Sequence, residues 1–268
     1  MKIITIIVGF SLFALISCTS NSNSTSTSGS SGGGSDSSVS TVEQGKRNYL
    51  YSKETRLYWP TPLKDGEPDT VALNLTQKNY YVVFDGSGSM DSKECGTKDR
   101  SREDVAKDVL TQFANQIPTT DNLGLFMFDN DGVREVVPLG SNTREQFISS
   151  VQKGQAGSGT PLKTAIGEGI KALGVQARKQ LGYGEYHLVV VTDGEASLGE
   201  DPSDNVMFTL NYTPIVLHTI GFCIGTDHVL NQKGRTDYKS ADSPESLAKG
   251  LKSVLAESES FTVDSFKQ

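Results

Sequence analysis

The sequence has few residues of the kinds that carry zinc or thiol chemistry. Its 268 residues include three cysteines, three histidines and a single tryptophan, and the motifs C-x-x-C and H-E-x-x-H are both missing. Zinc ligation and thiol-redox catalysis therefore have no sequence basis. Any metal that this chain binds would have to be held by oxygen atoms.

Positive charge is also scarce. The chain has 25 Lys and Arg against 32 Asp and Glu, a formal net charge of −7, and removing a leader whose only charged residue is Lys2 makes the balance more negative. Because an acidic protein is repelled by nucleic acid and by anionic lipid headgroups, we expect no nucleic-acid partner. An acidic balance is compatible with cation binding.

The N-terminus lacks an apolar run long enough to cross a bilayer. Residues 3–16 are apolar but fall short of the roughly 20 residues that a spanning helix needs. Residues 1–17 are therefore predicted to be a signal peptide. The sequence Leu15-Ile16-Ser17-Cys18 resembles the lipobox of bacterial lipoproteins, in which the cysteine is acylated. An ordinary signal peptide with an incidental cysteine is the alternative.

The lipobox resemblance has consequences for location. It implies an exported lipoprotein, held in the membrane of the cell envelope by acyl chains such as palmitate on Cys18. Position 19 is Thr rather than Asp. In the lipoprotein sorting pattern, this implies the outer membrane if the host has two membranes.

Two segments precede the main domain. Residues 18–41 contain almost only Ser, Thr, Gly and Asn after the cysteine. Such a composition cannot offset the entropy of ordering, so a flexible tether is predicted. Residues 42–78 are predicted to be an extension packed on the domain. Trp59 would serve there as a packing plug rather than as a partner-binding aromatic, and alternation over residues 71–75 predicts a half-buried strand.

Residues 79–258 alternate between apolar runs and amphipathic helical patterns. The runs typical of strands are 80–84, 123–128, 133–137, 187–192 and 214–222, and the helical patterns are 101–117, 144–151, 162–177, 203–211 and 244–256. This alternation predicts an α/β, doubly wound fold, with a mostly parallel central sheet and helices on both faces. A tight-turn sequence at residues 129–132 predicts a hairpin and hence one antiparallel edge strand. Residues 259–268 are left as a C-terminal tail.

Three polar loops are expected at one rim of this sheet. They read Asp85-Gly86-Ser87-Gly88-Ser89, Gly157-Ser158-Gly159-Thr160-Pro161 and Thr192-Asp193-Gly194-Glu195. In doubly wound sheets, ligands bind at the carboxyl ends of strands, near the point where the strand order reverses. The three loops are therefore predicted to meet there.

In order and spacing, these loops resemble the metal-ion-dependent adhesion site (MIDAS) of the von Willebrand factor A domain family. The resemblance covers roughly residues 79–256 and implies that family's Rossmann-like fold. It also implies the metal ligands Asp85, Ser87, Ser89, Thr160 and Asp193. Hydroxyl and carboxylate oxygens suit a hard divalent cation, so Mg²⁺ is the expected cofactor, with Mn²⁺ or Ca²⁺ as alternatives. The family's mechanism implies that a Glu or Asp of a protein partner completes the coordination.

The function expected from these features is protein binding and adhesion without catalysis. A metal-dependent hydrolase at the same rim is one alternative, but the sequence has no G-x-S-x-G elbow and no G-x-x-x-x-G-K-[ST] phosphate loop. A von Willebrand factor A scaffold that binds no metal and serves a cell-envelope assembly is another. All five implied ligand positions nevertheless retain a coordinating side chain.

The two remaining cysteines leave a disulfide open. Cys95 follows the first polar loop and Cys223 ends a predicted strand, so both belong near the same rim. An exported protein could pair them, but an intervening strand would leave about 10 Å for the loops to close. A disulfide and two separate thiols remain alternatives.

Several other titratable residues are not assigned to the metal. His187 and His218 lie in apolar runs, where a core histidine with satisfied hydrogen bonds is expected rather than a ligand. Asp91, Asp129 and Glu195 lie near the polar loops. For these three, a supporting or solvated role is expected rather than direct ligation.

Overall fold

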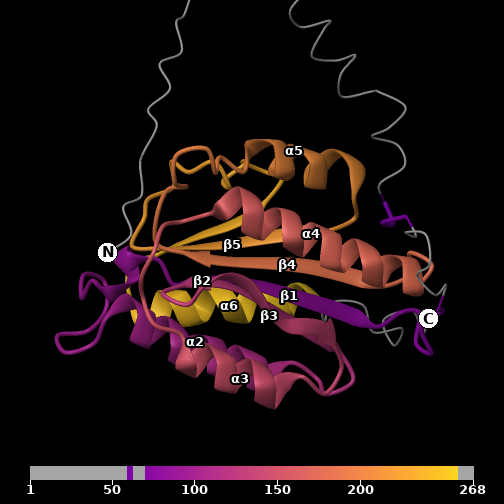
Figure 1. The fold of residues 1–268 in the computed structure, drawn as a ribbon, viewed down its shortest axis with the longest axis horizontal. Helices are drawn as coiled ribbons and strands as arrows, with labels where there is room; N and C mark the ends of the chain where they lie inside the picture. Colours follow the sequence, from indigo (N-terminus) through magenta and orange to yellow (C-terminus); the bar gives the residue numbers. More distant parts are fainter. Residues whose placement is uncertain (1–58, 63–69, 259–268) are drawn as a thin grey trace, which may run out of the picture. The chain divides into compact units, whose positions relative to one another are not determined.

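The computed structural model describes residues 59–62 and 70–258. The predicted signal peptide, Cys18, the tether and the C-terminal tail lie outside the described residues. A six-stranded sheet with the order β3-β2-β1-β4-β5-β6 forms the centre of the fold (Figure 1). Its strands are β1 (Lys78–Asp85), β2 (Asn122–Asp129), β3 (Gly132–Gly140), β4 (Glu185–Thr192), β5 (Val216–Phe222) and β6 (Asp237–Ala241).

Helices cover both faces of this sheet. They are α2 (Arg102–Gln116), α3 (Arg144–Lys153), α4 (Leu162–Lys179), α5 (Ser203–Tyr212) and α6 (Pro244–Ser258), together with the short 3-10 helix η2 (Gly88–Asp91). In Figure 1, α4 and α5 lie on one side of the sheet, and α2, α3 and α6 lie on the other. The predicted doubly wound α/β fold is confirmed. In the described part of the chain, no helix is long and apolar enough to cross a membrane.

Strand directions also follow the prediction. β1 pairs in parallel with both β2 and β4, and the parallel ladder continues through β5 to β6. β3 is antiparallel to β2, as the turn at residues 129–132 predicted. Because β2 and β4 lie on opposite sides of β1, the strand order reverses at β1, and this is where a ligand site is expected.

The core has two halves because side chains on a strand alternate between faces. On β1, Tyr80, Val82 and Phe84 pack with α2, α3 and α6, whereas Tyr81 and Val83 pack with α4 and α5. All five side chains are almost completely buried. Burial of an apolar side chain such as Val82, Val83 or Phe84 stabilises the fold by about 1.5–3 kcal/mol relative to exposure. This burial on both faces holds the end of β1 in a fixed position.

The histidines of β4 and β5 belong to this core. His187 stacks on Tyr80 with ring centroids 4.8 Å apart, and its Nδ1 lies 3.1 Å from Nε2 of His218. His218 Nδ1 in turn lies 3.0 Å from Oδ2 of Asp237. Both histidines are buried, so their predicted place in the core is confirmed. The predicted satisfaction of their hydrogen bonds is not complete, because Nε2 of His187 has no hydrogen-bond partner among the described residues.

The segment before β1 differs from the prediction. Residues 71–75 form no strand, and Val71 and Leu73 are 58% and 108% exposed. Both edges of β1 are already taken by β2 and β4, so the segment has no edge of that strand to join. Instead, Ala72 donates its backbone N–H to the carbonyl of Lys179 at the end of α4. Trp59 does pack, edge-on against Tyr186 with centroids 5.3 Å apart.

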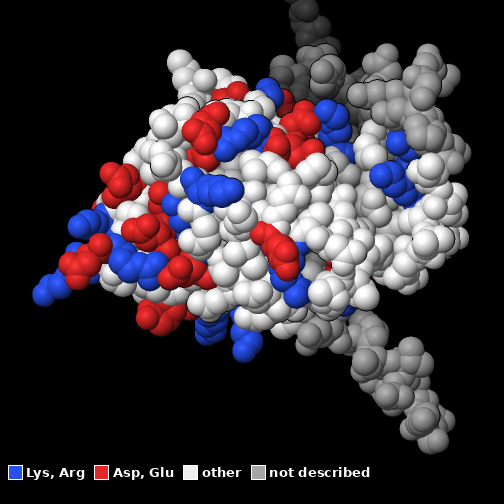
Figure 2. Space-filling view, turned by 60° about the horizontal axis from the view of Figure 1, so that its bottom comes forward, with Lys and Arg blue, Asp and Glu red and all other residues white. Residues whose placement is uncertain are grey.

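Strand β6 was not predicted. Its five residues are mostly polar and only partly buried, because it lies at the edge of the sheet. On the face drawn in Figure 2, most acidic side chains lie close to basic ones.

Candidate metal centre

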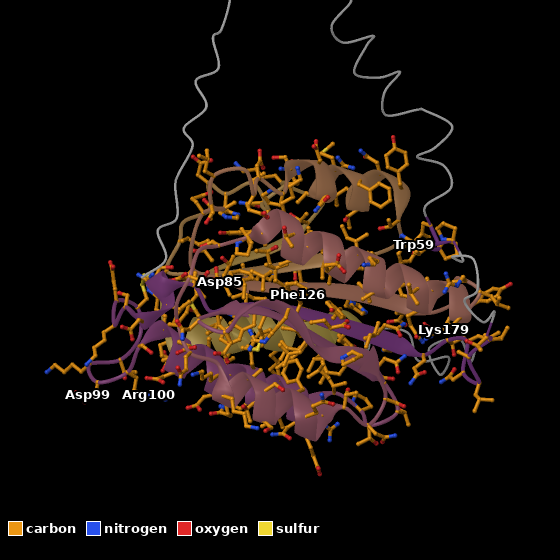
Figure 3. The ribbon with its side chains drawn as sticks, viewed as in Figure 1. Trp59, Asp85, Asp99, Arg100, Phe126 and Lys179 are labelled. Carbon is orange, nitrogen blue, oxygen red and sulfur yellow. A yellow bond between two sulfur atoms is a disulfide. The ribbon has the colours of Figure 1, made fainter. Side chains whose placement is uncertain are left out.

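The candidate site lies at the carboxyl ends of β1 and β4, at the reversal of strand order. Asp85 is the last residue of β1, and Asp193 follows directly after β4. Figure 3 places Asp85 at the end of the sheet near the loop of Asp99 and Arg100, with Lys179 at the opposite end. The parallel pairing of β1 with β4 brings the two acidic loops to one rim.

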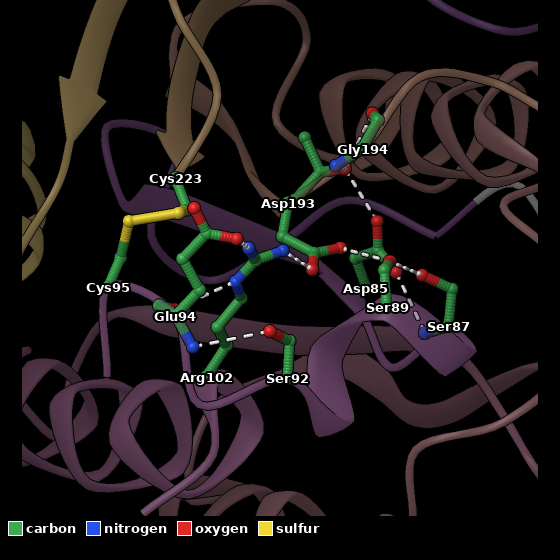
Figure 4. A network of polar contacts seen from close by, with 11 residues as sticks. Asp85, Ser87, Ser89, Ser92, Glu94, Cys95, Arg102, Asp193, Gly194 and Cys223 are labelled. Carbon is green, nitrogen blue, oxygen red and sulfur yellow. Dashed lines mark hydrogen bonds and ion pairs between the residues drawn. A yellow bond between two sulfur atoms is a disulfide. The ribbon is translucent and has the colours of Figure 1, made fainter. Parts of the chain in front are cut away.

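A hydrogen-bond chain joins these loops (Figure 4). Ser87 Oγ lies 3.1 Å from Ser89 Oγ, and Ser89 Oγ donates to Asp193 Oδ1 over 2.7 Å. Asp85 Oδ1 accepts a 2.8 Å hydrogen bond from the backbone N–H of Ser87, which curls the loop around the carboxylate. Four of the implied ligands, from segments about a hundred residues apart, are thus in one network.

Thr160 reaches the same rim on a loop held by backbone contacts. Gly88 donates its N–H to the carbonyl of Ser158 over 3.2 Å, and Gly157 donates to the carbonyl of Gly86 over 2.8 Å. Thr160 itself is 8% exposed and lies just before α4. The structure therefore brings all five implied ligands to one rim.

Ser197, which sequence reasoning missed, fixes Thr160. Its backbone N–H donates to the carbonyl of Thr160 over 3.0 Å, and its Oγ accepts the N–H of Thr160 over 2.8 Å. Glu200, on the same loop, accepts hydrogen bonds from the backbone N–H and the hydroxyl of Thr164 in the first turn of α4. The loop that follows Asp193 thus sets the position of Thr160.

Asp85 is the most deeply buried carboxylate of the site. Burial raises its pKa to about 6, while hydrogen bonds from Ser87 and Thr192 act in the opposite direction, and the neighbouring charge of Asp193 adds to the rise. Thr192 Oγ1 donates to Asp85 Oδ2 over 2.5 Å. A buried carboxylate with this environment gains from a nearby cation, which stabilises its ionised form.

Arg102 is a second residue that sequence reasoning missed. Its Nη1 donates to Asp193 Oδ2 over 2.7 Å, and its Nη2 lies 3.3 Å from Oε2 of Glu94 (Figure 4). Its side chain is 9% exposed, and that of Asp193 is 0% exposed. The sequence pattern places Arg102 in the first turn of a helix but does not predict its contact with Asp193.

A disulfide joins Cys95 to Cys223, with Cα atoms 5.7 Å apart. Strand β4 lies between β1 and β5, as predicted from the sequence. The loop after η2 crosses the width of β4 and places Cys95 beside the end of β5. The alternative of two separate thiols is therefore not what the structure contains.

The other acidic residues near the rim have different surroundings. Asp129 is buried and paired with Arg134, whose Nη1 lies 2.6 Å from its Oδ1. Glu195 is 71% exposed, with Oε2 3.7 Å from Nε2 of His228, and Asp91 is exposed. None of the three shares a hydrogen bond with the five implied ligands in the described part of the chain.

The donor set indicates the kind of ion that would fit. Within residues 59–62 and 70–258, no three His, Cys, Asp or Glu side chains gather closely enough to hold an ion by themselves. Instead, the hydroxyls of Ser87 and Ser89 share one hydrogen-bond network with the carboxylates of Asp85 and Asp193, and Thr160 lies on the neighbouring loop. Hydroxyl and carboxylate oxygens are hard donors suited to a small divalent cation that also keeps water ligands. The residues present therefore fit such a cation.

Comparisons with known proteins agree with this geometry. The family model of the von Willebrand factor type A domain matches residues 79–268 of this chain. YwmD of Bacillus subtilis (strain 168) is 26% identical over 173 residues, which is 58% of this chain and 72% of YwmD.

Two solved structures share the fold. Proximal thread matrix protein 1 from the mussel byssus is 20% identical, with a TM-score of 0.53, over 67% of this chain and 47% of that one. One structure of that mussel protein has a zinc-occupied MIDAS motif. The pilus adhesin SpaC from Lactobacillus rhamnosus GG is 14% identical, with a TM-score of 0.55, over 70% of this chain and 31% of that one. This chain thus spans less than half of either solved chain. Because the family model matches well over half of the sequence, the chain belongs to the von Willebrand factor type A domain family.

Proposed function

We propose that this protein is a binding module that uses a divalent cation to hold an acidic protein partner. The observation that carries the proposal is the contact between Ser89 Oγ and Asp193 Oδ1, which joins the β1 and β4 loops within one set of oxygen donors. The cation would be held by Asp85, Ser87, Ser89, Thr160 and Asp193. When bound, it would supply a positive centre at the exposed edge of the rim.

Mg²⁺ is the proposed ion. Ser87, Ser89 and Thr160 offer neutral hydroxyls, so the two aspartates alone would supply negative charge and the ion would stay partly uncompensated. Mn²⁺ and Ca²⁺ remain alternatives, and the zinc-occupied site of the mussel relative supports a divalent cation in general. The partner is proposed to contribute a Glu or Asp carboxylate, because that group neutralises the remaining charge.

Non-catalytic binding is favoured over hydrolysis by the contacts of the carboxylates. Both oxygens of Asp85 accept hydrogen bonds, from Ser87 and Thr192, and both oxygens of Asp193 accept from Ser89 and Arg102. The described contacts of these two carboxylates include no His or Lys that could act as a general base. Members of this family are generally adhesion or interaction modules.

The proposed module is tethered to a membrane of the cell envelope. Acylation of Cys18 would anchor the chain, and residues 19–41 would hold the domain away from the bilayer. Labelling with an alkyne-tagged palmitate in a bacterial host tests this proposal. The full chain should take up the label and Cys18→Ser should not, whereas equal labelling would contradict the lipoprotein assignment.

Partner binding is tested by affinity capture from envelope extracts. The protein should retain a partner in Mg²⁺ and release it in chelator, and Ser87→Ala should fail to retain it in either condition. Ser92→Ala is a matched control, since Ser92 is near the site but its Oγ accepts only from Glu94 N–H among the described contacts. A partner retained equally in chelator would contradict the proposed function.

A further inference from the structure

Strand β6 is the last strand of the sheet in the described part of the chain. Cys223 donates its backbone N–H to the carbonyl of Ala241 over 2.6 Å, so the backbone groups of Ala241 are directed toward β5. Because backbone groups alternate in direction along a strand, Lys239 also bonds toward β5, whereas Tyr238 and Ser240 direct their N–H and C=O groups away from the sheet. These two residues present donors and acceptors to which another strand could bond.

A cleft with a volume of about 510 Å³ lies beside this edge, between β6 and α6. Lys239 lines it from β6 and Lys249 lines it from α6, and no acidic residue is among the described residues that form its walls. α6 comes close to β6 here, since a Cβ on Gly250 would lie 3.5 Å from the Cβ of Lys239. Lys239 also pairs with Asp237 over 2.5 Å, while Lys249 is exposed. The walls of the cleft are thus basic in a chain that is acidic as a whole.

The other face of β6 is held by hydrogen bonds to the loop after β5. The Tyr238 hydroxyl donates to the carbonyl of Gly225 over 2.7 Å, and Ser240 Oγ donates to the carbonyl of Ile224 over 2.8 Å. β6 is therefore fixed in an extended conformation before any partner binds. Such preorganisation reduces the entropy that binding would otherwise cost.

The handedness of strand connections disfavours a further strand of this chain at the edge. α6 follows β6 and lies on the same side of the sheet as α2, through which the chain passes from β1 to β2 (Figure 1). A right-handed connection on that side leads in the direction from β6 toward β5. A parallel strand added beyond β6 directly after α6 would need a left-handed connection, which is rare.

Charge disfavours a second copy of the chain at the same edge. Antiparallel pairing over the full length of two β6 strands would place Lys239 of one copy opposite Lys239 of the other. Lys249 would add a further positive charge from each copy. Like charges directly opposite one another destabilise a strand pair, whereas opposite charges stabilise it. An acidic side chain therefore suits this position better.

We propose that β6 and the cleft bind an extended segment of a partner protein, which adds a strand to the sheet and places an acidic side chain beside Lys239 and Lys249. Hydrogen bonds to the backbone of Tyr238 and Ser240 would supply affinity, and the lysines would select acidic segments. The site is separate from the candidate metal centre, because β6 lies at the edge of the sheet and the metal ligands follow β1 and β4 or precede α4. Binding at β6 should therefore need no cation.

The test uses two synthetic peptides, acetyl-TVTDTVT-amide and acetyl-TVTKTVT-amide, which differ only in the charge of the central residue. Each is titrated into the isotope-labelled protein in the presence of chelator and followed by NMR. The acidic peptide should slow hydrogen exchange at the Tyr238 and Ser240 amides. It should also bind about tenfold more tightly than the basic peptide, because opposite charges attract across a strand pair.

Two variants on α6 test the selection by charge. Lys249→Glu should lose the preference for the acidic peptide. Lys252→Glu is the matched control, because Lys252 is also on α6 but does not line the cleft, and it should keep the preference. Equal affinity of the wild-type protein for the two peptides, or an unchanged preference in Lys249→Glu, would overturn the proposal.

A third variant tests strand addition itself. Ser240→Pro removes an N–H that faces away from β5, a position where an edge strand tolerates proline, and should abolish binding of the acidic peptide. If this variant does not fold, the exchange rates of the Tyr238 and Ser240 amides in the wild-type protein decide, and rates unchanged by the acidic peptide would overturn the proposal. A dimer of the free protein in sedimentation that Ser240→Pro dissociates would assign the edge to a second copy and would also overturn it.

Discussion

Thr192 Oγ1 donates a 2.5 Å hydrogen bond to Asp85 Oδ2, which joins the carboxyl ends of β4 and β1 at the centre of the sheet. Both residues are completely buried. The hydrogen bond from this hydroxyl stabilises the ionised carboxylate and lowers the pKa of Asp85, whereas burial raises it. This hydrogen bond therefore supports the sheet and the candidate metal centre together.

Replacing Thr192 by Val should destabilise the sheet and the candidate metal centre. A hydrogen bond to a charged group contributes about 1.5–3 kcal/mol, so the free energy of unfolding should fall by about 2 kcal/mol in urea titrations. Thr219→Val on β5 is the control, because the buried Thr219 hydroxyl has no hydrogen-bond partner among the described residues. It should leave stability unchanged or slightly higher. Equal losses in the two variants would contradict a specific role for the Thr192 hydroxyl.

Gly86 allows the first polar loop to approach β2 closely. A Cβ at this position would lie 2.9 Å from the Cβ of Asp129 and 3.0 Å from the carbonyl oxygen of Phe128. Gly86→Ala should therefore reduce the free energy of unfolding by about 1–3 kcal/mol. Gly225→Ala, where a Cβ would meet nothing within 4 Å, should have a much smaller effect in the same urea titration. Similar losses in both variants would show that close approach is not the reason for Gly86.

Acid should destabilise the fold through His187. Burial lowers the pKa of His187 from its ordinary 6.5 to about 3, with smaller contributions from His218 and Lys78. Between those two pH values the unfolded chain binds a proton that the folded chain does not. Stability from this group is thus complete above pH 6.5 and falls by about 1.4 kcal/mol per pH unit below it.

The comparison with His187→Leu isolates this effect. In chelator, Asp85 acts in the opposite direction, because its raised pKa makes the folded chain bind a proton more readily than the unfolded chain. That contribution is common to both proteins and cancels in the difference. From pH 6.5 to 5.5, the wild-type protein should lose about 1 kcal/mol relative to His187→Leu. Parallel pH curves would mean that His187 titrates normally in the folded state.

The Cys95–Cys223 disulfide should contribute to stability. The two cysteines are separated by 128 positions in the sequence, and a crosslink that closes so long a loop strongly restricts the unfolded chain. The double variant Cys95→Ser, Cys223→Ser should be about 2–5 kcal/mol less stable in urea titrations. Reductant should lower the stability of the wild-type protein and leave the double variant unaffected. An unchanged wild-type protein under reductant would count against the link.

The sheet and the rim could be predicted from sequence because each strand carried a local signal. Apolar runs ending in Asp85 or in Thr192-Asp193 indicated buried parallel strands, and parallel strands bring their carboxyl ends to one edge. β6 lacked such a run, since an edge strand with one partly exposed face tolerates polar residues. Its existence depends on pairing with β5, which no local pattern records.

The residues that support the site could not be predicted in the same way. Arg102, Glu94 and Ser197 act through contacts between loops, and the paths of those loops depend on the whole fold. The sequence could not decide whether Cys95 and Cys223 are paired, because the course of the loop that carries Cys95 could not be predicted. Local periodicity identifies strands and helices but says little about where a long loop goes.

Calorimetric titration of Mg²⁺ into the purified protein and into Ser89→Ala and Ser92→Ala decides whether the rim is a metal centre. Ser89 lies between Ser87 and Asp193 in the hydrogen-bond chain, whereas Ser92 contacts the backbone of Glu94. One Mg²⁺ should bind to the wild-type protein and to Ser92→Ala with similar affinity, and at least tenfold more weakly to Ser89→Ala. Absence of binding to the wild-type protein, or equal binding to all three, would contradict the assignment.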